Sequence, residues 1–77
     1  MSQHLPVLSG RSVVAVFGRA GWVFVRQAGS HMILVKDGEI VSLSVPDHRE
    51  VARGTLRSLI RSAGMTVDEF VELSRSK

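Results

Sequence analysis

Residues 22–45 read WVFVRQAGSHMILVKDGEIVSLSV, and this stretch decides the fold class. It is rich in valine, isoleucine and aromatic residues, which favour β-strands. Its three apolar runs predict three strands, at 22–27, 31–36 and 39–45. The Asp37-Gly38 pair between the last two runs is typical of a two-residue hairpin turn. We therefore expect a three-stranded antiparallel meander.

A two-residue turn at this point would also fix the register of the hairpin. It pairs Lys36 with Glu39 and, further along, Leu34 with Val41 and His31 with Ser44. One face is then almost wholly apolar and is expected to be the core: Met32, Leu34, Val41, Leu43 and Val45. The other face becomes polar at one end: His31, Ile33, Val35, Ile40, Ser42 and Ser44. We predict that Leu34 and Val41 are buried and that His31 lies on the open face. The first strand is apolar on both parities, so its faces stay unassigned.

Helical patterns flank the strands on both sides. Apolar residues recur at helical spacing over 12–20, with Ser9 as a candidate N-cap and Gly21 placed to end the helix. A second helix is predicted over 54–63, with Leu56, Leu59, Ile60 and Ala63 facing inward and Gly64 ending it. Pro46 to Arg53 is polar and is expected to be a loop.

A short last helix is predicted after the second one. Thr66 and Glu69 have the spacing of a capping box, and Val67, Phe70, Val71 and Leu73 can pack back on the domain. The expected fold is α+β, with the order α-β-β-β-α and a short C-terminal helix. Its helices cover one face of a three-stranded antiparallel sheet, as in double-stranded-RNA-binding domains. We expect one domain over 1–77, with a core from about residue 7 to 74.

The composition restricts the function classes. Lysine and arginine number 10 against 7 acidic residues, which is compatible with a nucleic acid, an acidic partner or simple solubility. The chain has no cysteine, which excludes disulfides and thiolate zinc sites and fits a reducing cytoplasm. No run of residues is long and apolar enough to cross a membrane, so no membrane association is expected.

The three histidines, His4, His31 and His48, lie far apart and lack metal-ligand spacing. We therefore expect no metal and no other cofactor. His31 follows Gly29-Ser30 at the start of a strand, and Ser30 would point to the opposite face, which argues against a hydrolase dyad. A histidine titrates near neutral pH and can accept the 2′-hydroxyl proton of RNA without a metal. A surface histidine without a function is the alternative.

The second basic feature is an arginine stripe. Arg49, Arg53, Arg57 and Arg61 recur every four residues, and the last three would line the side of the second helix opposite its apolar face. Such a stripe fits a phosphate backbone, although a solvated helix face is an equal alternative. Candidate RNA-binding residues are Arg26, Ser30, Lys36, Arg53, Arg57 and Arg61. The sequence does not rank Arg26, Lys36 and His48 as helpers of His31.

Several segments, taken in order, resemble the HicA family of bacterial and archaeal toxins over residues 7–74. They are Leu8-Ser9-Gly10-Arg11, Gly21-Trp22 through Arg26 to Gly29-Ser30-His31, Val45-Pro46-Asp47-His48, Gly54-Thr55-Leu56-Arg57-Ser58-Leu59-Ile60-Arg61 and Ala63-Gly64-Met65-Thr66-Val67-Asp68-Glu69-Phe70. The resemblance implies the toxin of a type II toxin-antitoxin system, which cleaves messenger RNA and blocks translation. It further implies a double-stranded-RNA-binding-like fold and inhibition by a HicB-like antitoxin. The family's catalytic histidine corresponds to His31, and Met32 stands where many members have a second histidine.

Two other functions remain open at this point. One is a non-catalytic RNA-binding module with the same fold and arginine stripe. The other is an interaction domain that only binds an antitoxin, for which the open face around Ile33, Val35 and Ile40 offers a surface. The intact Gly29-Ser30-His31 motif favours the enzyme, a metal-independent endoribonuclease.

Overall fold

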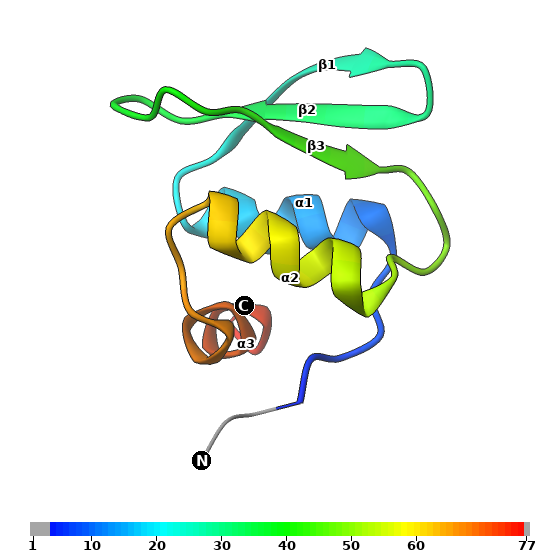
Figure 1. Cartoon of the computed structure of the whole chain (residues 1–77), viewed down its shortest axis with the longest axis vertical. Coiled ribbons are helices and arrows are strands. Elements are labelled where there is room, and N and C mark those ends of the chain that lie inside the picture. The colour runs from blue at the N-terminus through cyan, green and yellow to red at the C-terminus, as the bar shows by residue number, and fades with distance from the viewer. Residues whose placement is uncertain (1–3, 77) are drawn as a thin grey trace.

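The computed structural model describes residues 4–76. Along the chain its elements are α1 (Gly10–Arg19), β1 (Val23–Ala28), β2 (His31–Val35), β3 (Leu43–Pro46), α2 (Arg53–Ser62) and α3 (Val67–Ser74). The strands form one antiparallel sheet in the order β1-β2-β3. Helices α1 and α2 lie under one face of this sheet, and α3 packs against both of them on their far side (Figure 1). This arrangement confirms the predicted α+β fold, with the helices on one side of a three-stranded meander.

The helix ends follow the predicted local chemistry. Ser9 caps α1, because its side chain accepts a hydrogen bond from the Ser12 N–H. Thr66 and Glu69 form the predicted capping box at the start of α3. Gly21 and Gly64, which follow α1 and α2, both have positive φ values and let the chain turn away from the helix axis. The apolar residues predicted to face inward from α2 are all buried.

The register of the β2-β3 hairpin differs from the prediction by two residues. The turn itself forms, since the Glu39 N–H donates to the Lys36 carbonyl, but residues 39–42 lie outside the strand. Leu34 therefore pairs with Leu43 instead of Val41, and His31 pairs with Pro46 instead of Ser44. The predicted strand over 39–45 was wrong in its first half, and Pro46, expected in the loop, ends β3.

A shift of two residues keeps every side chain on its predicted face, because side chains alternate with a period of two. Met32, Leu34, Leu43 and Val45 are buried as expected. Val41 is 46% exposed, so the prediction that it is buried was wrong. The shifted pairing brings Leu43, which is 1% exposed, against Leu34 in its place. Leu43 thus has a covered partner on the helix side, and Ile40 and Val41 are left in an exposed loop.

Strand β1 has an irregularity that settles its faces. Phe24 pairs with Leu34 and Arg26 with Ile33, so Val25 is an extra residue that opposes no partner. Beyond this bulge Arg26 shares the open face with Ile33, and Gln27 lies on the helix side with Met32. The outer edge of β1 pairs with no strand in residues 4–76, and its large apolar residues are exposed on both faces: Val23, Phe24 and Val25.

The core lies between the sheet and α1 and α2 and continues under α3. Its largest fully buried side chains include Phe17 of α1 and Phe70 of α3, whose ring centroids are 5.2 Å apart. Leu34 and Leu43 enter this core from the sheet, and Leu56 and Ile60 from α2. No helix within residues 4–76 is long and apolar enough to cross a membrane.

Candidate functional site

His31 is the first residue of β2, directly after the turn that joins it to β1. It pairs with Ala28 on one side and with Pro46 on the other. Its neighbour Met32 is buried on the helix side of the sheet, so the exposed His31 points to the face that α1 and α2 leave open. The imidazole is thus accessible from solvent at one end of the sheet. The alternation of apolar residues in the sequence predicted this face for His31.

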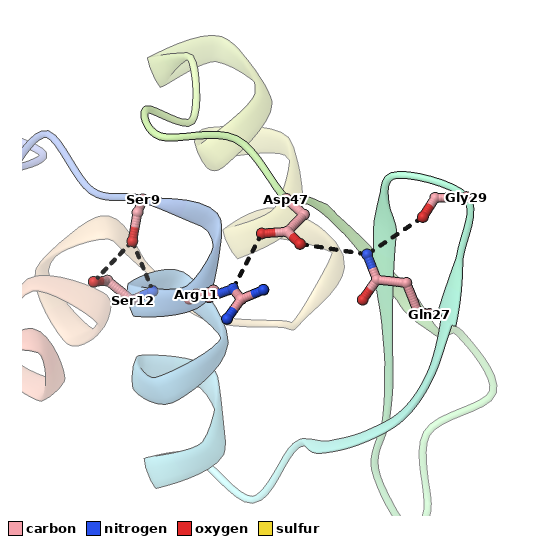
Figure 2. A network of polar contacts seen from close by, with 6 residues as sticks. All are labelled: Ser9, Arg11, Ser12, Gln27, Gly29 and Asp47. Carbon is pink, nitrogen blue, oxygen red and sulfur yellow. Dashed lines mark hydrogen bonds and ion pairs between the residues drawn. The ribbon is translucent and has the colours of Figure 1, made fainter.

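A polar network fixes the same end of the sheet from the helix side (Figure 2). The Asp47 carboxylate accepts from Arg11 Nε through Oδ1 and from Gln27 Nε2 through Oδ2, each at 3.4 Å. Gln27 Nε2 also lies 3.3 Å from the Gly29 carbonyl oxygen, to which it donates. The Asp47 N–H donates to the Ser30 carbonyl at 2.8 Å. One residue therefore connects α1, β1 and the turn that precedes His31.

Residues 46–48 are held between this turn and the start of α1. The Gly10 N–H donates to the His48 carbonyl at 2.9 Å, and the Val51 N–H donates to the Leu8 carbonyl at 2.8 Å. Gly10 also approaches Pro46 so closely that a Cβ on Gly10 would overlap the Pro46 carbonyl oxygen. His48 is exposed just beyond Asp47, on the segment that lies beside Ser30.

Of two candidate cations, the structure places one near His31 and the other far from it. Arg26 is exposed on the same sheet face as His31 and occupies the position diagonal to it on β1. Diagonal positions on adjacent strands have Cβ atoms about 7–8 Å apart, which a long arginine side chain can span. Lys36 follows the far end of β2, roughly 16 Å from His31 at the usual rise of a strand. Arg26 and His31 therefore occupy diagonal positions on one face of the sheet, and Lys36 lies at the other end of β2.

The arginine stripe is exposed along α2, as predicted, with Arg53, Arg57 and Arg61 on the side away from Leu56 and Ile60. Because α2 packs against the helix side of β3, the stripe and His31 lie on different sides of the sheet. Only the beginning of α2 lies at the same end of the molecule as the β1-β2 turn (Figure 1). An RNA that contacts both groups would have to pass around this end.

Sequence reasoning missed Asp47, Gln27 and Arg11 as members of the site. Each is a common polar residue, and their contacts join positions up to 36 residues apart. The bulge at Val25 also hid the face of Gln27, because it breaks the simple alternation along β1. The one available signal was the position of Asp47 directly after the strand that ends beside His31.

The arrangement provides an exposed imidazole with an arginine on the same surface. Such a pair can accept a proton from a hydroxyl group and hold a neighbouring phosphate. Ser30 is exposed in the turn before His31 and presents a hydroxyl group at the same edge. Within residues 4–76, no group of three or more histidine, aspartate or glutamate side chains is arranged to hold a metal ion.

Comparisons with known proteins found one matching family model and a similar solved structure. The family model described as HicA toxin of bacterial toxin-antitoxin matches residues 10–65. A chain in a solved structure described as a toxin-antitoxin complex from Streptococcus pneumoniae is 27% identical, with a TM-score of 0.68. The match covers 75% of this chain and 98% of that one. No curated protein sequence is similar enough to give a significant match.

Proposed function

The chain belongs to the HicA toxin family, and from this premise we propose that it is an endoribonuclease that cuts messenger RNA and thereby blocks translation. In this proposal it is the toxin of a toxin-antitoxin system and acts in the cytoplasm. The observation that carries the enzymatic part is the position of His31, which is exposed on the open face of the sheet with Arg26 diagonal to it.

In the proposed mechanism His31 acts as a general base. The imidazole takes the proton of a 2′-hydroxyl, and the 2′-oxygen forms a bond to the adjacent phosphorus. The bond from phosphorus to the 5′-oxygen breaks, and that oxygen takes up a proton as the chain separates. The first product carries a 2′,3′-cyclic phosphate. In this mechanism Arg26 stabilises the extra negative charge on the phosphate in the transition state.

The test compares the purified wild-type chain with His31→Ala on a labelled messenger RNA transcript. General base catalysis contributes on the order of a hundred to ten thousand fold, so we expect His31→Ala to lose nearly all cleavage. Circular dichroism should show an unchanged fold, because His31 is exposed and pairs only through its backbone. We expect wild-type cleavage to survive EDTA and to leave 2′,3′-cyclic or 3′-phosphate ends.

Full activity of His31→Ala, a strict need for a divalent metal, or 3′-hydroxyl products would contradict the mechanism. His48→Ala is the matched control for removing one exposed imidazole from the same end of the molecule. If only His31→Ala loses RNA cleavage, the proton transfer is assigned to His31. If both variants lose cleavage equally, the result does not assign the proton transfer to His31 and contradicts its special role.

The proposed partner is an antitoxin of the HicB type. The similar chain from Streptococcus pneumoniae belongs to a structure described as a toxin-antitoxin complex, and this supports an antitoxin partner here. The exposed Val35 and the half-buried Ile33 on the open face provide apolar area beside His31 for such a partner. A protein that covers this area would also block access of RNA to the imidazole.

One observation favours a second candidate function, a non-catalytic RNA-binding module. The stripe of Arg53, Arg57 and Arg61 is exposed on a different side of the sheet from His31, so it can bind phosphates without using the imidazole. If the wild-type chain binds RNA with a strong salt dependence but leaves it uncut, this second function is the correct one.

A further inference from the structure

On the helix side of the sheet, side chains of other elements hold the turn that precedes His31. Within residues 4–76 the His31 imidazole takes part in no side-chain hydrogen bond or ion pair, so its position depends on the backbone that carries it. Gln27 lies on the helix side of the sheet, opposite Met32, and its amide joins the Gly29 carbonyl to the Asp47 carboxylate. Gly29 lies two residues before His31 and Gln27 four residues before it. Figure 2 shows the Gln27 amide between Gly29 and Asp47.

We propose that Asp47 is a positioning residue for His31, acting through Gln27 and the Gly29-Ser30 turn; the proposal rests on the function given above. Asp47 does not touch the imidazole, because the two side chains lie on opposite sides of the sheet. It acts on the backbone from which His31 emerges. Arg11 on α1 holds Asp47 in place, because its Nε donates to Oδ1, the carboxylate oxygen that Gln27 does not contact.

The geometry explains why a carboxylate is needed at position 47. Both Asp47 oxygens accept, one from Arg11 and one from Gln27, and both partners are donors at these atoms. An amide in the same place offers only one acceptor oxygen, and its NH₂ group would face one of the two donors. Asp47 is partly shielded, with its side chain 25% exposed, whereas Arg11 is 83% exposed. Water therefore replaces the lost acceptor only in part.

The experiment measures Asp47→Asn by two independent methods. Nuclear magnetic resonance relaxation of the backbone amides at 29–31 reports the order of the turn without reference to any activity. Steady-state cleavage of the labelled transcript at several RNA concentrations reports kcat and KM separately. Misplacement of a catalytic group by about 1 Å can cost roughly a hundredfold, so we expect kcat to fall by about tenfold to a hundredfold. We expect KM to change by less than about threefold, because the phosphate-binding cations remain.

Glu50→Gln is the matched control. It also removes one negative charge by a carboxylate-to-amide change, three residues further along the same loop, where Glu50 is exposed. We expect this control to behave as wild type in both measurements. A fall in kcat of similar size in Glu50→Gln would show that the loss of charge, and not the contact with Gln27, is responsible, and would overturn the proposal.

A charge exchange tests which contact carries the effect. Gln27→Glu alone would bring a second carboxylate against Asp47 and would remove the donor to the Gly29 carbonyl, so it should lower kcat as Asp47→Asn does. In the double variant the new amide at position 47 can donate to the new carboxylate at position 27, but the Gly29 carbonyl still has no donor. We therefore expect kcat and the order of residues 29–31 to stay below wild type, and full recovery of kcat would overturn a role that runs through the turn.

The outcomes separate this proposal from the function on which it rests. If the wild-type chain leaves RNA uncut, the proposed enzyme is wrong, and the relaxation data still decide whether Asp47 orders the turn. If wild type cuts RNA and Asp47→Asn keeps its kcat and the order of residues 29–31, the positioning role is wrong. Should Asp47→Asn fail to fold, Gln27→Ala replaces it, because Gln27 is exposed and removal of its amide breaks the same connection.

Discussion

At Gly10 the chain leaves no room for a side chain. A Cβ there would overlap the carbonyl oxygen of Pro46, the residue that pairs with His31. Gly18, in the same helix, has no atom within 4 Å of the position its Cβ would take. The two glycines of α1 therefore have opposite roles: Gly10 is required by a close approach between segments, and Gly18 only weakens the helix.

The first prediction compares these two positions. Gly10→Ala should lower the free energy of unfolding by about 1–3 kcal/mol, because the backbone at Pro46 has to move to admit a methyl group. Gly18→Ala should raise it by about 0.5–1 kcal/mol, because alanine loses less backbone entropy in a helix. Urea unfolding of both variants measures the difference. Equal midpoints would mean that residues 46–48 are not packed on α1 as described.

Single residues also show where sequence reasoning stops. His31 was placed on the correct face because a buried Met32 follows it, and alternation needs no knowledge of the partner strand. Gln27 was not placed, because the first strand is apolar on both parities. The bulge two residues earlier, which reverses its face, has no sequence signal of its own. Asp47 was missed because its partners Arg11 and Gln27 come from other elements, and single-sequence patterns contain no such contacts.

At the scale of elements, helix boundaries were predicted well and strand pairing less well. Caps and glycines near a helix end act on backbone groups that are close in sequence. Ser9 and Thr66 therefore indicate where a helix begins without knowledge of the rest of the fold. Strand pairing depends on which partners become covered by the helices. The Asp37-Gly38 turn formed as expected, yet Leu34 pairs with the buried Leu43, and Val41 lies in an exposed loop.

The second prediction concerns the exposed arginines of α2. In a His31→Ala background, Arg53→Glu with Arg57→Glu should weaken RNA binding across all sequences. It should also reduce the salt dependence of binding, because a protein with fewer phosphate contacts releases fewer counterions when it binds. Fluorescence anisotropy at several salt concentrations measures both effects. A control with the same charge change, Arg19→Glu with Arg75→Glu, alters exposed residues that are not among the candidate RNA-binding residues. An equal effect in both pairs would indicate a response to net charge and not a binding surface.

Over the whole molecule, α3 belongs to the same core as the segment that matches the family model. That match ends at residue 65, before α3 begins. Phe70 and Val71 are nevertheless buried, and Phe70 contacts the ring of Phe17 in α1. Arg19 of α1 also donates to the Leu73 carbonyl at 2.8 Å. These contacts close the side of the helix layer that faces away from the sheet.

Truncation after Met65 should therefore abolish cooperative folding. Loss of one buried phenylalanine alone costs about 3–5 kcal/mol, and domains of this size have only about 5–15 kcal/mol of stability in total. Truncation after Ser74 should leave the melting temperature within a few degrees of the full chain, because Arg75 and Ser76 are exposed. Thermal unfolding followed by circular dichroism compares the two. A cooperative transition in the shorter chain would show that α3 is dispensable.

The outer edge of β1 has a consequence for anyone who prepares this protein on its own. Its free amide and carbonyl groups, together with the exposed Val23, Phe24 and Val25, form a template on which further strands can assemble. Arg26 is the one charged residue in this strand and so the one gatekeeper against stacking. Concentrated stocks will therefore lose material to insoluble β-rich particles over time, and mutation of Arg26 to a neutral residue will speed that loss.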